Sequence, residues 1–113
     1  MKYALLIYDN PAAYDGWSED DRQAITNEYF AIREAPGVYG GLRLQPIETT
    51  TTVRANGSGE ALTTDGPFAD TKEVVGGLYL LEADDLDKAI EVAARIPAAR
   101  HGGGIEIRPI VEY

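Results

Sequence analysis

The sequence predicts a single α+β domain in which two β-α-β units flank a β-hairpin. Two segments with helical features, Ser18–Pro36 and Asp84–Pro97, alternate with short β-prone runs. A chain of 113 residues has the usual length of one domain and can bury one hydrophobic core. Residues 1–113 are therefore expected to fold as one unit.

The first β-α pair begins with an apolar, β-prone run, Tyr3–Tyr8, which is typical of a central strand covered on both faces. Ser18 then has the character of a helix N-cap, with Asp21 at the capping-box position. Apolar side chains at helical spacing follow: Ile25, Tyr29 and Ile32. This helix is expected to bury that face and to end at Pro36-Gly37.

The middle of the chain predicts β-structure. Val38–Leu44 is a glycine-containing run that indicates a short or irregular strand. Two further runs, Glu48–Ala55 and Glu60–Thr64, are separated by Asn56-Gly57-Ser58-Gly59, a strong hairpin signal. Because the first of these runs is rich in threonine, we expect the hairpin to be half exposed.

The last third repeats the β-α-β order. Val74–Leu81 is a strand in which Gly76-Gly77 predicts a bulge or the close approach of another backbone or a ligand. Asp84 is the expected cap of the second helix, with Asp87 at its capping-box position. The helix should bury Leu86, Ala89, Ile90 and Ala93, pair Glu91 with Arg95, and stop at Pro97. Ile105–Val111 alternates up to Pro109, which predicts an edge strand or a strand end.

These elements predict a ferredoxin-like split βαβ fold with an inserted β-hairpin. Two helices can cover only one face of such an antiparallel sheet, so the other face needs a partner. Back-to-back pairing of two chains into a dimeric α+β barrel would cover it and enclose a cleft. A homodimer is therefore the expected assembly.

Composition excludes several classes of function. The 19 acidic and 10 basic residues give a net charge of −9, which disfavours binding to nucleic acid or to anionic membranes. No cysteine is present, so disulfides, thiolate metal sites and cysteine nucleophiles are excluded. With one histidine and no ligand motif, neither a metal nor another cofactor is expected. The initial apolar run is too short for a signal peptide or a membrane span, and a cytoplasmic location is expected.

The most informative motif is Asp65-Gly66-Pro67-Phe68, which continues to Glu73 and lies between two predicted strands. Pro67 should restrict Gly66 to an extended conformation and stiffen the loop. Asp65 could then serve as a general base if burial raised its pKa, and Phe68 could wall a pocket. Alternatively, Asp65 forms an Asx-turn and the motif is a structural turn.

Other residues could contribute to a site. Lys72, paired with Glu73, could bind an anion or could be an ordinary exposed charge. His101, the only histidine, could shuttle protons from its flexible loop or be a plain loop residue. Arg108 could bind a substrate anion or a carboxylate on a partner strand. Tyr8 and Tyr79, both on predicted strands, fit core or interface positions better than catalytic ones.

Three segments resemble the YCII-related, or DGPF-domain, family: Met1–Tyr8, Asp65–Glu73, and Ile96–Arg100 leading to Ile105–Ile110. They occur in order along essentially the whole chain, and the resemblance implies a dimeric α+β barrel. In shorter relatives a His–Asp pair lines the cleft and suggests an enzyme. The region Ser18–Gly41 here contains no histidine, so that pair is not carried over.

Three functional hypotheses follow. In the first, the dimer binds a small molecule in its barrel cleft, as a binding protein or as a cofactor-free enzyme, with Asp65 and Phe68 shaping the cleft and Tyr8, Lys72 and Arg108 nearby. The second, implied by the family's association with extracytoplasmic-function sigma factors, is an interaction module with a partner from that pathway. In the third, the motif only locks a turn and the dimer has no catalytic role.

Overall fold

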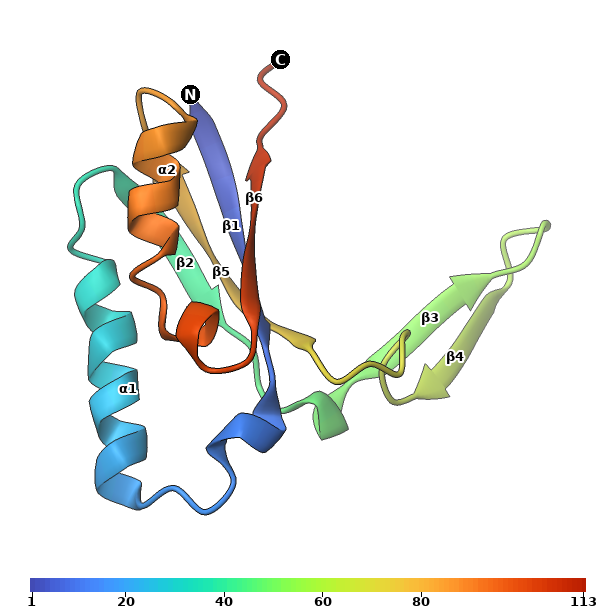
Figure 1. Ribbon diagram of the computed structural model, residues 1–113. Helices are drawn as coiled ribbons and strands as arrows, with labels where there is room; N and C mark the ends of the chain where they lie inside the picture. The colour runs from blue at the N-terminus through green and yellow to red at the C-terminus, as the bar shows by residue number, and fades with distance from the viewer.

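A four-stranded antiparallel sheet with two helices on one face forms the body of the protein in the computed structural model, which describes all 113 residues (Figure 1). Its strands are β1 (Lys2–Asp9), β2 (Val38–Arg43), β5 (Val74–Glu82) and β6 (Gly104–Pro109). The helices are α1 (Glu19–Ile32) and α2 (Leu86–Ala93). The α+β class predicted from the sequence is confirmed. No helix has the length and apolar character needed to cross a bilayer.

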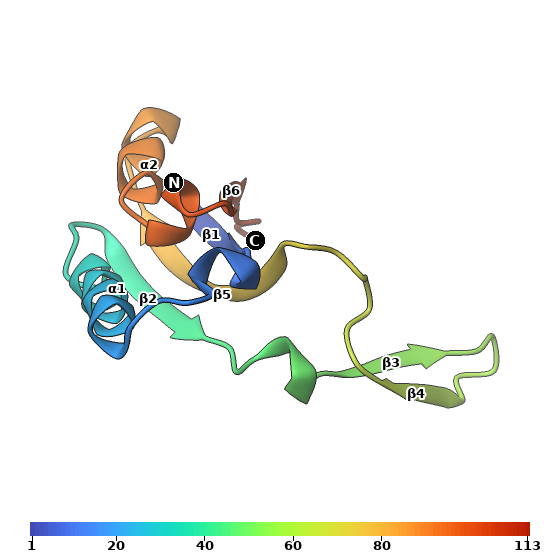
Figure 2. The same ribbon diagram turned by 60° about the horizontal axis from the view of Figure 1, so that its bottom comes forward.

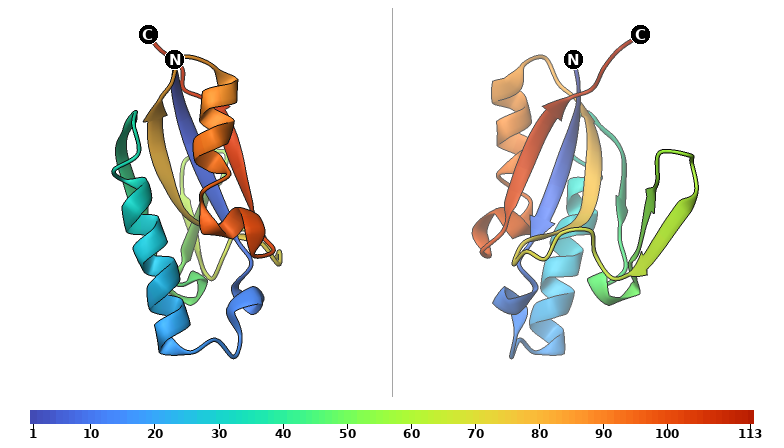
Figure 3. Two further views of the ribbon diagram at one scale, coloured as in Figure 1. Left: turned by 60° about the vertical axis from the view of Figure 1, so that its left-hand side comes forward. Right: turned by 90° about the vertical axis from the view of Figure 1, so that its right-hand side faces the viewer.

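The strands lie in the order β2-β5-β1-β6, and all neighbouring pairs are antiparallel. Helix α1 connects β1 to β2, which lie on either side of β5. Helix α2 connects β5 to β6, which lie on either side of β1. Each helical connection therefore passes over one strand, and both helices lie against the same face (Figure 3).

The hydrophobic core lies between this face and the helices. Alternate residues of β1 point inward, and Tyr3, Leu5 and Ile7 are at most 4% exposed. The core also receives side chains from β5, both helices and the segment around the 3-10 helix η3 (Pro97–Arg100), namely Tyr79, Leu81, Ile32, Ala89, Ile96 and Ala98. The period-2 pattern of the strands sorts these residues to one face.

The helix starts follow the sequence with one correction. Ser18 caps α1 as predicted, because its hydroxyl accepts the Asp21 backbone N–H at 3.1 Å. The cap of α2 is Asp85 rather than Asp84. Asp85 has an extended backbone, and its carboxylate accepts the Lys88 N–H at 3.0 Å, three residues into the helix.

The expected apolar stripe of α2 is only half buried. Ala89 and Ala93 face the sheet, whereas Leu86 and Ile90 are 53% and 47% exposed. Small residues at the contact let the helix lie close to the sheet, which leaves the larger side chains at its margin. The predicted pair of Glu91 with Arg95 is also replaced, because Glu91 contacts Lys88 at 3.6 Å.

The predicted hairpin is present and stands apart from the body. It consists of β3 (Thr51–Ala55) and β4 (Ala61–Asp65), which pair only with each other, and we call it the arm (Figures 1 and 2). The Asn56 side chain closes its turn by accepting two backbone N–H groups, from Ser58 and Glu60. Because the arm projects, the radius of gyration is 16.0 Å, against about 13 Å for a compact domain of this length.

The paired glycines of β5 form the bulge and allow the close approach of another backbone that the sequence predicts. The register between β1 and β5 shifts where Ile7 pairs with Gly77 and Tyr8 with Val75, so Gly76 lies in a bulge. A side chain at Gly77 would overlap the Leu42 carbonyl of β2, which explains the need for glycine there.

The sheet face opposite the helices is apolar and has no cover in the single chain. It carries the side chains of β1 and β5 that alternate with the core residues, including Ala4, Leu6, Leu78 and Leu80. We call this the open face. The single chain does not close into a barrel (Figure 3).

Candidate functional site

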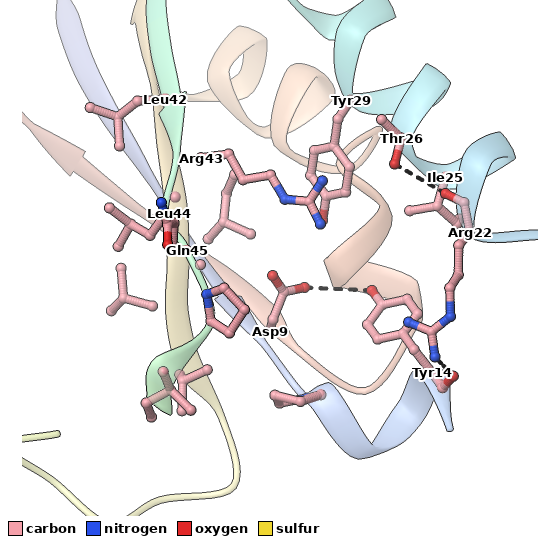
Figure 4. A pocket seen from close by; sticks show the side chains of 18 of the residues that line it. Asp9, Tyr14, Arg22, Ile25, Thr26, Tyr29, Leu42, Arg43, Leu44 and Gln45 are labelled. Atoms are coloured by element: carbon pink, nitrogen blue, oxygen red, sulfur yellow. Dashed lines mark hydrogen bonds between the residues drawn. The ribbon is translucent and has the colours of Figure 1, made fainter. Parts of the chain in front are cut away.

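A pocket of about 730 Å³ lies between α1, the 3-10 helix η1 (Pro11–Tyr14), and the adjoining ends of β2 and β5 (Figure 4). This volume is in the range of small-molecule sites in proteins. Apolar side chains line both sides of the pocket, Ile25 on α1 and Leu42 and Val75 on the strands. Four of its polar side chains point toward one another: Asp9, Tyr14, Tyr29 and Arg43.

Asp9 is the central acid of the pocket. It is the last residue of β1, and its carboxylate lies beside the bulge at Gly76, where any larger residue would collide with it. The Tyr14 hydroxyl donates a long hydrogen bond of 3.5 Å to Asp9 Oδ1. Burial raises the pKa of Asp9, and the Tyr14 hydrogen bond and the Arg43 charge oppose that rise only in part. Asp9 therefore holds its proton to a higher pH than an exposed aspartate.

Tyr29 brings an unused hydroxyl to the same place. Its phenolic oxygen is buried and forms no hydrogen bond of good geometry within the chain, although the Tyr14 hydroxyl and the Ala98 backbone lie near it and the Ala98 backbone lowers its pKa. Burial first, and then the Asp9 charge, raise the pKa of Tyr29. The phenol is therefore a proton donor at neutral pH, and buried polar groups usually have a partner.

A second tyrosine, Tyr79, holds the backbone of Tyr29 by a hydrogen bond. The Tyr79 hydroxyl of β5 donates to the Tyr29 backbone carbonyl at 2.6 Å. That carbonyl is free because α1 tightens at its end, where the Arg33 N–H bonds to Phe30 instead. The bond ties the last turn of α1 to the sheet and sets the position of the Tyr29 ring.

The η1 side of the pocket is held by contacts to α1 and to an aromatic cluster. The Arg22 side chain donates to the Tyr14 carbonyl at 2.7 Å. The Tyr14 ring packs edge-on against Trp17, with ring centroids 5.1 Å apart, and Trp17 packs in the same way against His101. Burial raises the pKa of Tyr14 too, so its hydroxyl remains a donor toward Asp9.

None of the site residues predicted from the sequence lines this pocket. Asp65 ends β4 and is exposed, Phe68 is 71% exposed beneath Arg54 of the arm, and Lys72 lies in the exposed link to β5. Their roles, and those of Pro67 and Glu73 in the same segment, remain predictions.

Gly66 does not have the ordinary extended conformation expected before proline. Its φ is +102°, which glycine adopts because it lacks a Cβ atom. Two hydrogen bonds hold it at the start of β3: its N–H donates to the carbonyl of Thr50, just before β3, and its carbonyl accepts the Thr52 hydroxyl. The start of the motif is thus part of the arm.

The remaining candidates lie elsewhere. Tyr8 and Arg108 are on the open face, where hydrogen bonding to the Glu106 carboxylate and its charge raise the pKa of Tyr8. His101 follows η3 and belongs to the aromatic cluster, outside the pocket. No group of three or more histidine, cysteine or acidic side chains could hold a metal ion.

Sequence reasoning missed Asp9 and Tyr29 for identifiable reasons. The predicted first strand ends at Tyr8, which leaves Asp9 in the following loop, and Tyr29 belongs to the buried face predicted for the first helix. A usable signal existed for Asp9: a carboxylate ends the central strand, and the glycine pair in β5 is the place where a side chain or ligand approaches.

The family model for the YCII-related domain matches residues 1–113. An uncharacterized protein of Rhizobium meliloti (strain 1021) is 32% identical over 118 residues, covering 100% of this chain and 94% of that protein. The chain belongs to the YCII-related domain family. The resemblance seen in the sequence is thereby confirmed, and the pocket at Asp9 is a feature of a YCII-related chain.

Proposed function

We propose that this YCII-related protein binds a small molecule in the pocket beside α1 and that Asp9 exchanges a proton with it. One observation carries the proposal: a cavity of ligand size ends at a half-buried carboxyl with a raised pKa and a buried phenol that has no partner. A ligand that shares a proton with Asp9 and accepts a hydrogen bond from Tyr29 would satisfy both groups.

The chemistry needed for a cofactor-free reaction is available at Asp9. A carboxyl whose pKa is raised by burial is a better proton acceptor near neutral pH than an ordinary aspartate. The Tyr29 phenol could stabilise negative charge that develops on a neighbouring oxygen of the ligand. The sequence hypothesis gave this role to Asp65, but the burial that the role requires is found at Asp9.

We also propose that the protein has the ferredoxin-like split βαβ fold and forms a homodimer through the open face. The strand order and the two connections that each pass over one strand support the fold assignment. The uncovered apolar side chains of the central strands support the pairing, as does the arm, because an isolated two-stranded hairpin is marginally stable in water. Such a dimer would enclose a barrel cleft, which is the rival location for a ligand.

The test compares the pocket with the Asp65–Phe68 motif. A fragment library is screened against the wild-type protein by ligand-observed NMR. Binding fragments are then measured against Thr26→Phe, which fills space between α1 and β2, and against Asp65→Ala/Phe68→Ala. Thr26 lines the pocket, and its side chain bonds only to the Arg22 carbonyl, so the larger side chain spares the core.

The proposal expects Thr26→Phe to weaken binding at least about ten-fold, which corresponds to 1.4 kcal/mol, while the motif variant binds as wild type. Fragments that bind Thr26→Phe as they bind wild type, but no longer bind Asp65→Ala/Phe68→Ala, would place the ligand site at the arm and the barrel cleft instead. A library without a single binder at millimolar concentration would contradict the proposal.

A further inference from the structure

We propose that the ligand of this pocket is a small organic carboxylate with an apolar body, and that Arg43 binds its carboxylate. The inference rests on the proposed function, since it names the class of molecule that the pocket takes. Three features of the pocket lead to it: its charge, the unpaired state of Arg43, and the apolar side chains that line it.

The charged residues that line the pocket have a net charge of opposite sign to that of the whole chain. The whole chain carries 19 acidic and 10 basic residues. The pocket is lined by three arginines and two acids, Asp9 and Glu48, so the local balance is 3 − 2 = +1. A positive patch on a protein with net charge −9 concentrates anions at that patch and excludes them from the rest of the surface.

Among the three arginines only Arg43 makes no hydrogen bond, ion pair or contact over an aromatic ring. Arg22 is engaged with the Tyr14 carbonyl, and Arg33 lies over the Phe30 ring with 5.6 Å to its centroid. Arg43 makes neither a hydrogen bond nor an ion pair within the chain. Its side chain extends from β2 toward Asp9 and Tyr29 (Figure 4). A free guanidinium offers two parallel N–H donors, which match a planar carboxylate.

The other polar groups fit the same ligand. The buried Tyr29 hydroxyl needs an acceptor, and a carboxylate oxygen is a strong one. Asp9 stands next to Arg43 without contacting it closely enough to form an ion pair, so the Arg43 charge is left for a second anion. Because burial favours the neutral form of Asp9, the acid can share its proton with the ligand instead of repelling it.

The apolar side chains of the pocket indicate what the rest of the ligand is. Leu42 and Leu44, beside Arg43 on the edge of the pocket, are 51% and 48% exposed without a ligand. Ile25 of α1 faces them across the cavity. Covering these side chains with a hydrocarbon or aromatic group would be favourable at about 25 cal/mol per Å². The ligand class is therefore amphiphilic rather than a small inorganic anion.

The experiment uses matched pairs of probes, namely acetate, benzoate and phenylacetate with their primary amides. Each amide has nearly the shape of its acid but no charge. Binding is followed by the fluorescence of Trp17, the one tryptophan of the chain, whose ring packs on Tyr14 of the pocket. Dissociation constants are measured for wild type, Arg43→Gln, and Arg95→Gln, which removes a positive charge outside the pocket.

We expect benzoate and phenylacetate to bind wild type at least about five-fold more tightly than their amides, and acetate to bind more weakly than both. Arg43→Gln should remove the preference, and Arg95→Gln should keep it. Amides that bind as tightly as the acids, or a preference that survives in Arg43→Gln, would overturn the ligand class while leaving a small-molecule pocket in place. If Thr26→Phe leaves all such binding unchanged, the proposed function fails as well.

Discussion

Removing the Tyr29 hydroxyl should weaken ligand binding without destabilising the fold. A buried hydroxyl without a partner costs about 1–3 kcal/mol of desolvation, and the Tyr29 hydroxyl makes no hydrogen bond within the chain. Tyr29→Phe keeps the ring that packs against the core and deletes only this oxygen. The free energy of unfolding should therefore stay the same or rise by up to about 1–2 kcal/mol.

Tyr79→Phe provides the matched control, because it also deletes one phenolic oxygen from a tyrosine of the same pocket. Here the hydroxyl donates to the Tyr29 carbonyl at 2.6 Å, and its loss leaves that carbonyl without this partner. We expect a loss of about 1–3 kcal/mol, or a fall in melting temperature of about 4 °C per kcal/mol for a domain of this size.

Urea unfolding followed by circular dichroism measures both variants, and benzoate titration measures their affinities. Tyr29→Phe should bind about two- to twelve-fold more weakly than wild type, since a neutral hydrogen bond contributes about 0.5–1.5 kcal/mol. Equal destabilisation by Tyr29→Phe and Tyr79→Phe would refute the reasoning, because it would mean that the Tyr29 hydroxyl has a structural partner. Unchanged benzoate affinity would remove Tyr29 from the site.

Three further predictions concern Asp9, the glycine pair and the open face. Asp9→Asn should be more stable than wild type at neutral pH, because burial raises the pKa of Asp9 above its ordinary value of 3.8 and penalises its charge. Folded Asp9 binds its proton more tightly than Asp9 of the unfolded chain does. The stability difference between Asp9→Asn and wild type should therefore shrink as pH falls through the raised pKa and vanish below 3.8. A stability difference in urea unfolding that does not depend on pH would contradict this. Gly76→Ala should push the Asp9 carboxylate aside, lower the free energy of unfolding by less than about 1 kcal/mol and weaken benzoate binding. Gly77→Ala should lower the free energy of unfolding by about 1–3 kcal/mol, because its Cβ would meet the Leu42 carbonyl, which cannot move freely. Equal melting temperatures for the two variants would contradict this prediction. Wild type should scatter light as twice 12.3 kDa at micromolar concentration, and Leu78→Glu on the open face should leave a folded monomer; a monomeric wild type would contradict the proposed dimer.

The fold could be predicted from the sequence because its signals are local. The apolar, β-prone run of β1, the Ser18 cap and the Asn56-Gly57 turn each depend on residues close in the chain, and each led to the observed element. The cap of α2 was misplaced by one residue because Asp84 and Asp85 are equally good caps. In the folded chain Asp85 is the cap, because its backbone is extended and its carboxylate accepts the Lys88 N–H.

The candidate site could not be predicted because its chemistry arises from distant contacts. Asp9 is an ordinary aspartate in the sequence, and its pKa is raised only where α1 and the ends of β2 and β5 bury it. Likewise, the Tyr29 hydroxyl is unusual only because it is buried in the folded chain without a hydrogen bond. The Asp65–Phe68 motif is one of the segments that resemble the family, but it lies away from this pocket. Its role at a dimer cleft and the protein's role in sigma-factor signalling remain predictions.

The central claim is that the Asp9 pocket is the ligand site of this YCII-related protein, and mapping bound phenylacetate tests it most directly. Backbone amide shifts of the wild-type protein are recorded by two-dimensional NMR during a titration. The claim predicts that the largest shifts surround Asp9, Tyr29, Arg43 and Gly76. Shifts confined to the Asp65–Glu73 segment, or to Tyr8 and Arg108 on the open face, would contradict it.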